Sequence, residues 1–276
     1  MKSKSKIPLI ALGMALLLCL GVGSSYAFYQ SPPGLTLFSQ DLRGRNATSL
    51  ATEIGIAAPD ATPAPVTGVQ HYTIGIQQFT DRLHSFFPAN STTLWGYVPA
   101  SYLVAAPPGP RHLGGIIVAE RNVPIQITFK NTLPLTSPIP QDITIPGTVD
   151  GPNRTAVHLH GGLVPWISDG GPFDWFDPTG KTGISFLNNA VLNPGAAPGE
   201  AEYYYPNNQS ARFVWYHDHA FGITRTNAYA GIASGYIIRD NFELNLGLPR
   251  IEGSAAVPAL SKLEIPIVIQ DKIFVD

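Results

Sequence analysis

Cysteine and charge are both scarce in this chain. Cys19 is the only cysteine among 276 residues, and charged residues make up 13% with a formal net charge of −2. Cys19 lies in an apolar N-terminal stretch that we expect to be removed, so the mature chain would form no disulfide and offer no thiolate ligand to a metal. The low, nearly balanced charge argues against a nucleic acid as the partner.

The N-terminus has the pattern of an export signal. Three lysines within the first six residues precede an apolar stretch at residues 7–22, and Ser25-Tyr26-Ala27 fits the small-x-small rule for cleavage. The stretch is somewhat shorter than the roughly 20 residues that span a bilayer. We therefore predict a signal peptide at residues 1–27, a secreted or periplasmic mature chain, and no stable membrane association after cleavage.

Glycine, proline and hydrophobic residues are abundant, and their arrangement favours β-structure. The chain has 27 glycines and 26 prolines, and 44% of its residues are hydrophobic. Apolar and alternating runs bounded by Gly and Pro clusters predict strands at residues 70–79, 116–120, 125–130 and 231–240. The sequence therefore predicts an all-β sandwich, with a long Gly-, Pro- and Asp-rich loop at residues 163–203.

The chain divides into four predicted regions. They are the signal peptide at 1–27, an extended arm at 28–65, a first domain at 66–245, and a linker with the start of a truncated second domain at 246–276. The apolar run at 265–276 predicts a strand that lacks a partner, and an unpaired apolar strand promotes aggregation. We therefore expect a fragment, a truncated gene product or half of a two-chain assembly.

Two short histidine motifs are the strongest indication of chemistry. They are His158-Leu159-His160 and His217-Asp218-His219, each preceded by apolar, β-prone residues. In a strand, residues i and i+2 project to the same side, about 7 Å apart. Each motif therefore directs two imidazoles to one site, and imidazole suits copper and zinc. One such pair alone is weak evidence, but two pairs predict a metal site at His158, His160, His217 and His219.

These motifs resemble those of the multicopper oxidases, in particular bacterial laccases of the spore-coat and bilirubin oxidase type. The resemblance covers residues 69–276. Its specific parts are Val157-His158-Leu159-His160-Gly161-Gly162 with Ser168-Asp169-Gly170, then Trp215-Tyr216-His217-Asp218-His219-Ala220 with Thr224-Arg225, and the weaker Leu94-Trp95-Gly96-Tyr97.

The resemblance implies Greek-key cupredoxin domains and copper as the cofactor. It implies that His158 binds the type 2 copper of a trinuclear cluster, that His160 and His217 bind one type 3 copper, and that His219 binds the other. Asp169 occupies the position of an acidic residue that assists protonation of reduced oxygen, although capping a turn before Gly170 explains it equally well. Asp218 faces away from its neighbouring histidines, and we interpret it as structural.

The chain departs from the family in what it lacks. The other two histidine motifs, including the one with the cysteine of the type 1 copper, are absent. The resemblance therefore implies the N-terminal portion of a multicopper oxidase, which needs the missing C-terminal cupredoxin domains. With them, it would take electrons from phenolic, bilirubin-like or metal substrates and reduce O2 to water. Alone, it would be inactive.

Two other readings remain open. One is a non-catalytic secreted module that holds a single copper or zinc ion with all four histidines, although a closed zinc site of four histidines would be unusual. The other is a zinc hydrolase, for which the sequence names no general base. Metal stoichiometry separates the module from the oxidase.

Overall fold

The computed structural model describes residues 36, 39, 55–61, 69–102, 109–247 and 264–274. The predicted signal peptide at 1–27 and most of the predicted arm lie outside the described residues. Contacts divide the chain into two compact units, one of Phe38–Val268 and one of Met1–Leu37 with Ile269–Asp276. The strands and the histidine motifs all belong to the first of these units.

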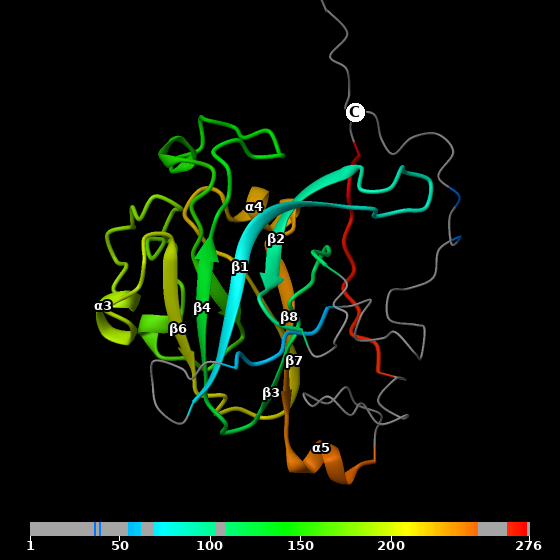
Figure 1. Cartoon of the computed structure of the whole chain (residues 1–276), viewed down its shortest axis with the longest axis vertical. Coiled ribbons are helices and arrows are strands. Elements are labelled where there is room, and N and C mark those ends of the chain that lie inside the picture. The colour runs from blue at the N-terminus through cyan, green and yellow to red at the C-terminus, as the bar shows by residue number, and fades with distance from the viewer. Residues whose placement is uncertain are drawn as a thin grey trace, which may run out of the picture. The chain divides into compact units, whose positions relative to one another are not determined.

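Within the residues that the structure describes, eight strands form two four-stranded sheets (Figure 1). The first sheet has the order β2 (Thr92–Pro99), β1 (Gln70–Asp81), β4 (Ile125–Asn131) and β6 (Glu200–Tyr205). The second has the order β3 (Ile117–Glu120), β8 (Ala233–Arg239), β7 (Arg212–Asp218) and β5 (Val157–His160). In both sheets one parallel pair, β1 with β4 and β3 with β8, accompanies antiparallel pairs.

The core lies between the sheets and is rich in aromatic rings. Tyr97 of β2 packs against Tyr216 of β7 with ring centroids 4.5 Å apart, so the two sheets meet there. Phe129 of β4 contacts the same Tyr216 at 6.0 Å. Such rings bury large apolar areas and contribute strongly to packing. The predicted cupredoxin-like, all-β sandwich is confirmed.

The helices and two of the strands were not predicted. Short helices occur at α3 (Asn188–Leu192), α4 (Thr224–Ala230) and α5 (Asn241–Asn245), with single 3-10 turns at Thr148–Asp150 and Trp166–Ser168. The loop predicted at 163–203 was wrong at both α3 and β6. Strand β6 is buried on both faces, so it lacks the alternation that identifies a half-exposed strand.

The described parts of the chain's two ends differ in their pairing. In the predicted arm, Ile56 bridges to Ile116 and Ala57 bridges to Tyr102, and both arm residues are buried. Residues 264–274 form no ladder with any other described segment. A β-strand is recognised by its hydrogen bonds to a partner strand. The strand predicted at 265–276, as the start of a second domain, therefore stays a prediction.

Among the described residues, none of the helices has both the length and the apolar character required to cross a membrane.

Candidate metal centre

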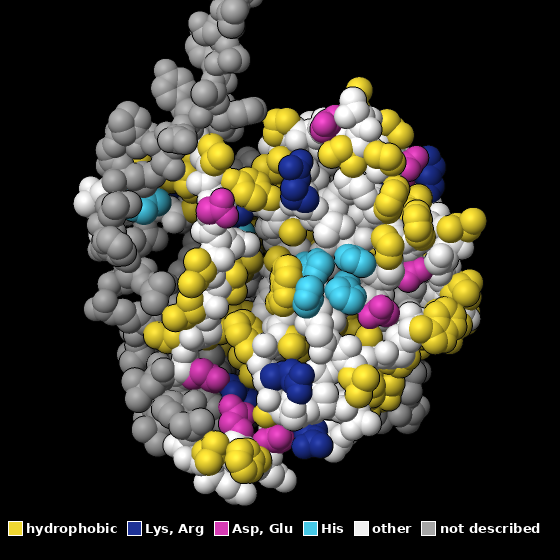
Figure 2. Space-filling view, turned by 180° about the vertical axis from the view of Figure 1, so that it is seen from behind, with side chains coloured by type: hydrophobic (Ala, Val, Ile, Leu, Met, Phe, Trp, Pro, Cys, Tyr) yellow, Lys and Arg dark blue, Asp and Glu magenta, His cyan; other side chains and the backbone are white. Residues whose placement is uncertain are grey.

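The four predicted ligands lie on or directly after two neighbouring strands. His158 and His160 belong to β5 and His217 belongs to β7, while His219 follows the end of β7. The antiparallel register places His158 opposite His217. Figure 2 shows histidine side chains gathered on one face of the molecule, with hydrophobic side chains beside them. The centroids of neighbouring rings lie from 4.8 Å to 6.0 Å apart.

Strand alternation explains why these imidazoles lie together on one face of the sheet. Tyr216 points into the core, where its hydroxyl group donates to the carbonyl oxygen of Gly115 at 2.5 Å. His217 and Trp215, on either side of Tyr216, therefore project from the opposite face of the sheet. His158 and His160 share that face on β5, and their rings are 5.8 Å apart.

Backbone carbonyl groups fix the orientation of three of the rings. The Nδ1 atoms of His158, His217 and His219 lie 2.6, 2.7 and 3.1 Å from the carbonyl oxygens of Asp169, Asp218 and Gly170, respectively. A carbonyl oxygen only accepts, so each of these Nδ1 atoms carries the proton and each Nε2 atom keeps its lone pair. In metal sites, a histidine ligand usually donates a hydrogen bond from its second ring N–H to a fixed acceptor in this way.

A loop with the sequence Asp169-Gly170 supplies two of those carbonyl groups. Gly170 has a φ angle of +66°, and a Cβ atom placed on it would lie 1.9 Å from the carbonyl oxygen of Val157 on β5. Only glycine permits both that conformation and that approach. Gly170 thereby lets the loop lie directly against β5, where its carbonyl groups reach His158 and His219.

His160 and His217 form a closer couple through different ring atoms. Nδ1 of His160 lies 3.3 Å from Nε2 of His217. Two ligands of one tetrahedral ion at bond lengths of roughly 2.0–2.1 Å are about 3.4 Å apart, so this spacing fits a shared ion. Within the described part of the chain, no three His, Cys, Asp or Glu side chains close around a single metal position. The histidines of the site are therefore arranged in pairs, and they do not surround one metal position as a closed ligand set.

Burial keeps the β7 side of the cluster uncharged. It lowers the pKa of His217 to about 4, with the neighbouring histidines acting in the same direction and the Asp218 carbonyl group opposing them. Burial, assisted by His158, also lowers the pKa of His219. Neutral imidazole is the form that binds metal ions, so these two residues need not lose a proton at neutral pH to act as ligands.

Trp215 stacks on the couple and is part of the same surface. Its ring lies 4.1 Å from that of His217 and 5.2 Å from that of His160, close to parallel with both. The indole is 40% exposed. An aromatic ring in this position restricts the rotation of both imidazoles and extends the apolar surface beside them.

Asp169 lies at the edge of the cluster. Its carboxylate Oδ1 is 3.4 Å from Nδ1 of His158, and its side chain is 53% exposed. The carboxylate is therefore close enough to act on water near His158, while its own carbonyl group holds that ring. Both a proton-handling role and a role in loop geometry are compatible with this position.

Asp218 lies behind the cluster, in the interior. It is fully buried, and burial raises the pKa of its carboxyl group to about 7, against the opposing effect of N–H groups from Ala156, Ala220 and Asn227. The other three histidines are elsewhere. His71 contacts Asp60 and Glu202, His84 lies beside Phe86, and the amide of His112 donates to Asp81.

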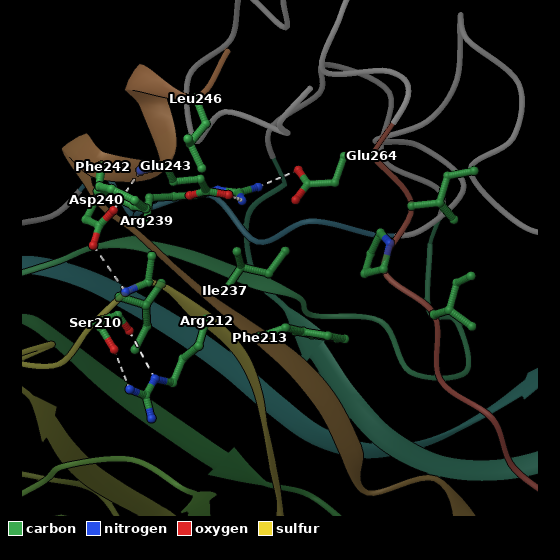
Figure 3. Close-up of a pocket in the computed structure, with 15 residues that line it drawn as sticks. Ser210, Arg212, Phe213, Ile237, Arg239, Asp240, Phe242, Glu243, Leu246 and Glu264 are labelled. Carbon is green, nitrogen blue, oxygen red and sulfur yellow. Dashed lines mark hydrogen bonds and ion pairs between the residues drawn. The ribbon is translucent and has the colours of Figure 1, made fainter. Parts of the chain in front are cut away.

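Figure 3 shows a groove of about 470 Å³ whose lining includes none of the four histidines. Its walls come from β7, β8, α5 and residues 264–267. Arg239 on β8 binds Glu243 at 2.6 Å and also binds Glu264, and its side chain is only 4% exposed. This cation is therefore neutralised by two acids, and its role is to join α5 and residue 264 to the sheet.

Sequence reasoning identified the histidines but missed what orients them. The carbonyl groups of Asp169 and Gly170 carry no side-chain signal, and only the Asp-Gly pair in the motif hints at a tight turn. The stacking of Trp215 on His160 depends on the cross-strand register, which places these residues opposite one another. Neither motif alone predicts the register between β5 and β7.

Known proteins are similar to this chain in sequence. A laccase from Bacillus stratosphericus is 36% identical over 74% of this chain and 34% of its own length. Multicopper oxidase LPR1 homolog 1 from Oryza sativa subsp. japonica is 30% identical over 96% of this chain and 42% of its own length. A solved multi-copper oxidase from Pediococcus acidilactici is 23% identical, with a TM-score of 0.46, over 71% of this chain and 30% of that one.

No protein-family profile matches the chain. The chain spans 34% and 42% of the length of the two curated relatives described above. Their names, together with the two histidine motifs and the sandwich that carries them, agree on one assignment. The chain belongs to the multicopper oxidase family.

Proposed function

We propose that this chain is the N-terminal, copper-binding portion of a secreted, laccase-like multicopper oxidase. In this proposal His158, His160, His217 and His219 supply half of the protein ligands of a trinuclear copper cluster of type 2 and type 3 copper. The complete enzyme would oxidise phenolic, bilirubin-like or metal substrates and reduce O2 to water. The chain alone would not be catalytically competent.

The spacing of the His160 and His217 nitrogens is the observation that carries the proposal. A separation of 3.3 Å suits two ligands of one ion. Two imidazoles do not complete the coordination of copper, which takes further nitrogen, sulfur or oxygen ligands. Pairs of histidines that leave the coordination of copper incomplete are therefore expected where another domain supplies the remaining ligands.

The chain's own residues would hold the copper and handle protons beside it. Bound copper would supply the electron-transfer and oxygen-binding chemistry. The carbonyl groups of Asp169, Asp218 and Gly170 would keep the Nε2 atoms of three histidines available as donors. The exposed carboxylate of Asp169 would hold or release a proton at Oδ1, next to His158.

Copper binding to the full chain tests the proposal. We expect copper measured by equilibrium dialysis to bind the wild type, and binding to fall at least tenfold in a His160→Gln/His217→Gln double variant. Trp215 stacks 4.1 Å from His217, so its fluorescence should be quenched as copper binds. Oxygen uptake with a phenolic reductant should stay at background for the chain alone.

His84→Gln is the matched control, because His84 lies outside the cluster and contacts Phe86 and Phe87. Copper binding that is equally weak in all variants, or equally strong in all, would refute the assignment of the ligands. One tightly held ion that requires all four histidines would instead favour a copper or zinc binding module.

A further inference from the structure

Asp218 separates the two histidines of the second motif but points the other way. Alternation along β7 directs His217 to the outer face of the sheet, within the histidine cluster, and Asp218 to the interior. The Asp218 side chain has no exposed area. A buried carboxylate is costly unless hydrogen bonds compensate it, so its partners reveal what it does.

The partners of Asp218 belong to both histidine motifs. Oδ1 accepts the backbone N–H of Ala156, two residues before His158, at 2.9 Å. Oδ2 accepts the backbone N–H of Ala220, directly after His219, at 3.3 Å. One carboxylate therefore fixes the start of β5 and the turn that carries His219.

Asn227 on α4 extends the connection. Its Nδ2 donates to Oδ2 of Asp218 at 3.2 Å and to the carbonyl oxygen of Arg154 at 3.1 Å. The backbone N–H of His219 donates to the carbonyl oxygen of Ala156 at 2.7 Å. These hydrogen bonds all connect the start of β5 with the end of β7, on the interior side of the histidines.

Strand β5 needs such a connection because it is short. It has four residues, and among the described segments β7 is its only strand partner. Its buried residues Val157 and Leu159 oppose a slip of one residue, which would turn the histidines to the other face, but they do not oppose a slip of two, which keeps the same face buried. A slip of two residues would displace the histidines along β7 by roughly 7 Å.

We propose that Asp218 is a positioning residue for the metal centre. Its carboxylate locks the register of β5 on β7 and the turn after His217, and so sets the distance between the ring nitrogens of the two motifs. The inference rests on the proposed function, because positioning matters only if the histidines bind copper. Asp218 itself would not contact the metal.

The test is Asp218→Asn in the full chain, with copper(II) as the probe. The amide has the same shape but presents N–H to a site that supplies N–H donors. We expect copper affinity to fall by about 10- to 100-fold, the range found for partners behind metal ligands. We also expect a changed copper(II) electron paramagnetic resonance spectrum, with an unchanged far-UV circular dichroism spectrum.

Asp177→Asn is the matched control. Asp177 is also buried, and its Oδ1 accepts the backbone N–H groups of Thr179 and Lys181 at 2.8 and 2.9 Å, within a turn that holds no histidine. This variant should keep the wild-type affinity and spectrum. The spectrum also separates positioning from charge, because loss of a distant negative charge weakens binding without altering the ligand geometry.

The outcomes distinguish this inference from the proposed function. No copper binding by the wild type would refute the proposed function. Copper binding by the wild type with the same affinity and spectrum in Asp218→Asn would refute the positioning role alone. If Asp218→Asn fails to fold, Asn227→Ser carries the test: weaker binding with an altered spectrum supports the role, and wild-type behaviour refutes it.

Discussion

At the residue scale, two glycines with the same backbone conformation have different roles. Gly170 and Gly109 have φ angles of +66° and +75°. A Cβ atom on Gly109 would meet nothing within 4 Å, whereas on Gly170 it would collide with the carbonyl oxygen of Val157 at 1.9 Å. Gly109 is thus required only by its φ angle, and Gly170 also by the contact of its loop with β5.

We predict that Gly170→Ala destabilises the fold by about 2–5 kcal/mol, because left-handed strain of about 1–2 kcal/mol adds to an overpacking cost of about 1–3 kcal/mol. The loop should move from β5 and withdraw the carbonyl groups from His158 and His219. Chemical denaturation measures the stability, and copper titration measures the loss of binding.

Gly109→Ala is the control for that measurement. It should cost only about 1–2 kcal/mol, from the φ angle alone, and should leave copper binding intact. Equal effects of the two substitutions on stability would show that the contact between Gly170 and Val157 is not important.

At the element scale, the strands that carry the histidines were easier to predict than those that support them. Residues 157–160 and 212–219 each carry two histidines at positions i and i+2 with apolar or aromatic neighbours, so the sequence shows the alternation of a strand there. Strand β6 has aromatic residues on both faces, because both faces are covered. Helix α4, which brings Asn227 to Asp218, is only seven residues long and stabilised by tertiary contacts, so local propensity did not reveal it.

A buried ionic cluster fastens the described part of the arm to the first sheet. His71 on β1 lies 3.0 Å from Asp60 of the arm and 3.6 Å from Glu202 on β6. The other described groups that bond to this cluster are neutral. Thr73 on β1 donates to Asp60, and Thr128 on β4 lies 2.8 Å from His71 and donates to Glu202. Asn193 after α3 also donates to Glu202. The bond to Glu202 raises the pKa of His71 above its ordinary value of 6.5, with burial opposing and the charges of Glu202 and Asp60 assisting.

We predict a pH-dependent contribution of His71 to stability. Because its pKa is raised in the folded state, the stabilisation is fully present below pH 6.5 and is lost as the pH rises through the folded-state value. The difference in unfolding free energy between the wild type and His71→Gln should therefore shrink from pH 5.5 to pH 8.5. Urea denaturation at a series of pH values measures it.

Asp60→Asn provides the comparison, because it removes one acid and keeps the histidine. In that background the pH dependence of the His71→Gln effect should be smaller. An effect of His71→Gln that is the same at both ends of the pH range would contradict a charged His71 in this cluster.

At the scale of the whole molecule, metal binding and folding should be coupled. The couples of histidines depend on the pairing of β5 with β7 and on the loop at Asp169 and Gly170, all of which are lost on unfolding. A ligand that binds only the folded state stabilises it by about 2.7 kcal/mol at a concentration 100 times its dissociation constant.

We therefore predict that copper(II) raises the melting temperature of the full chain by roughly 5–10 °C at that concentration, since 1 kcal/mol corresponds to about 2–4 °C for a domain of this size. Differential scanning calorimetry with and without copper measures the shift. The His160→Gln/His217→Gln variant should lose most of it, because Nδ1 of His160 and Nε2 of His217 form the couple with the spacing of a shared ion. Magnesium, which prefers oxygen ligands, should leave the melting temperature unchanged. An equal copper shift in the wild type and the double variant would place the stabilising ion elsewhere on the chain.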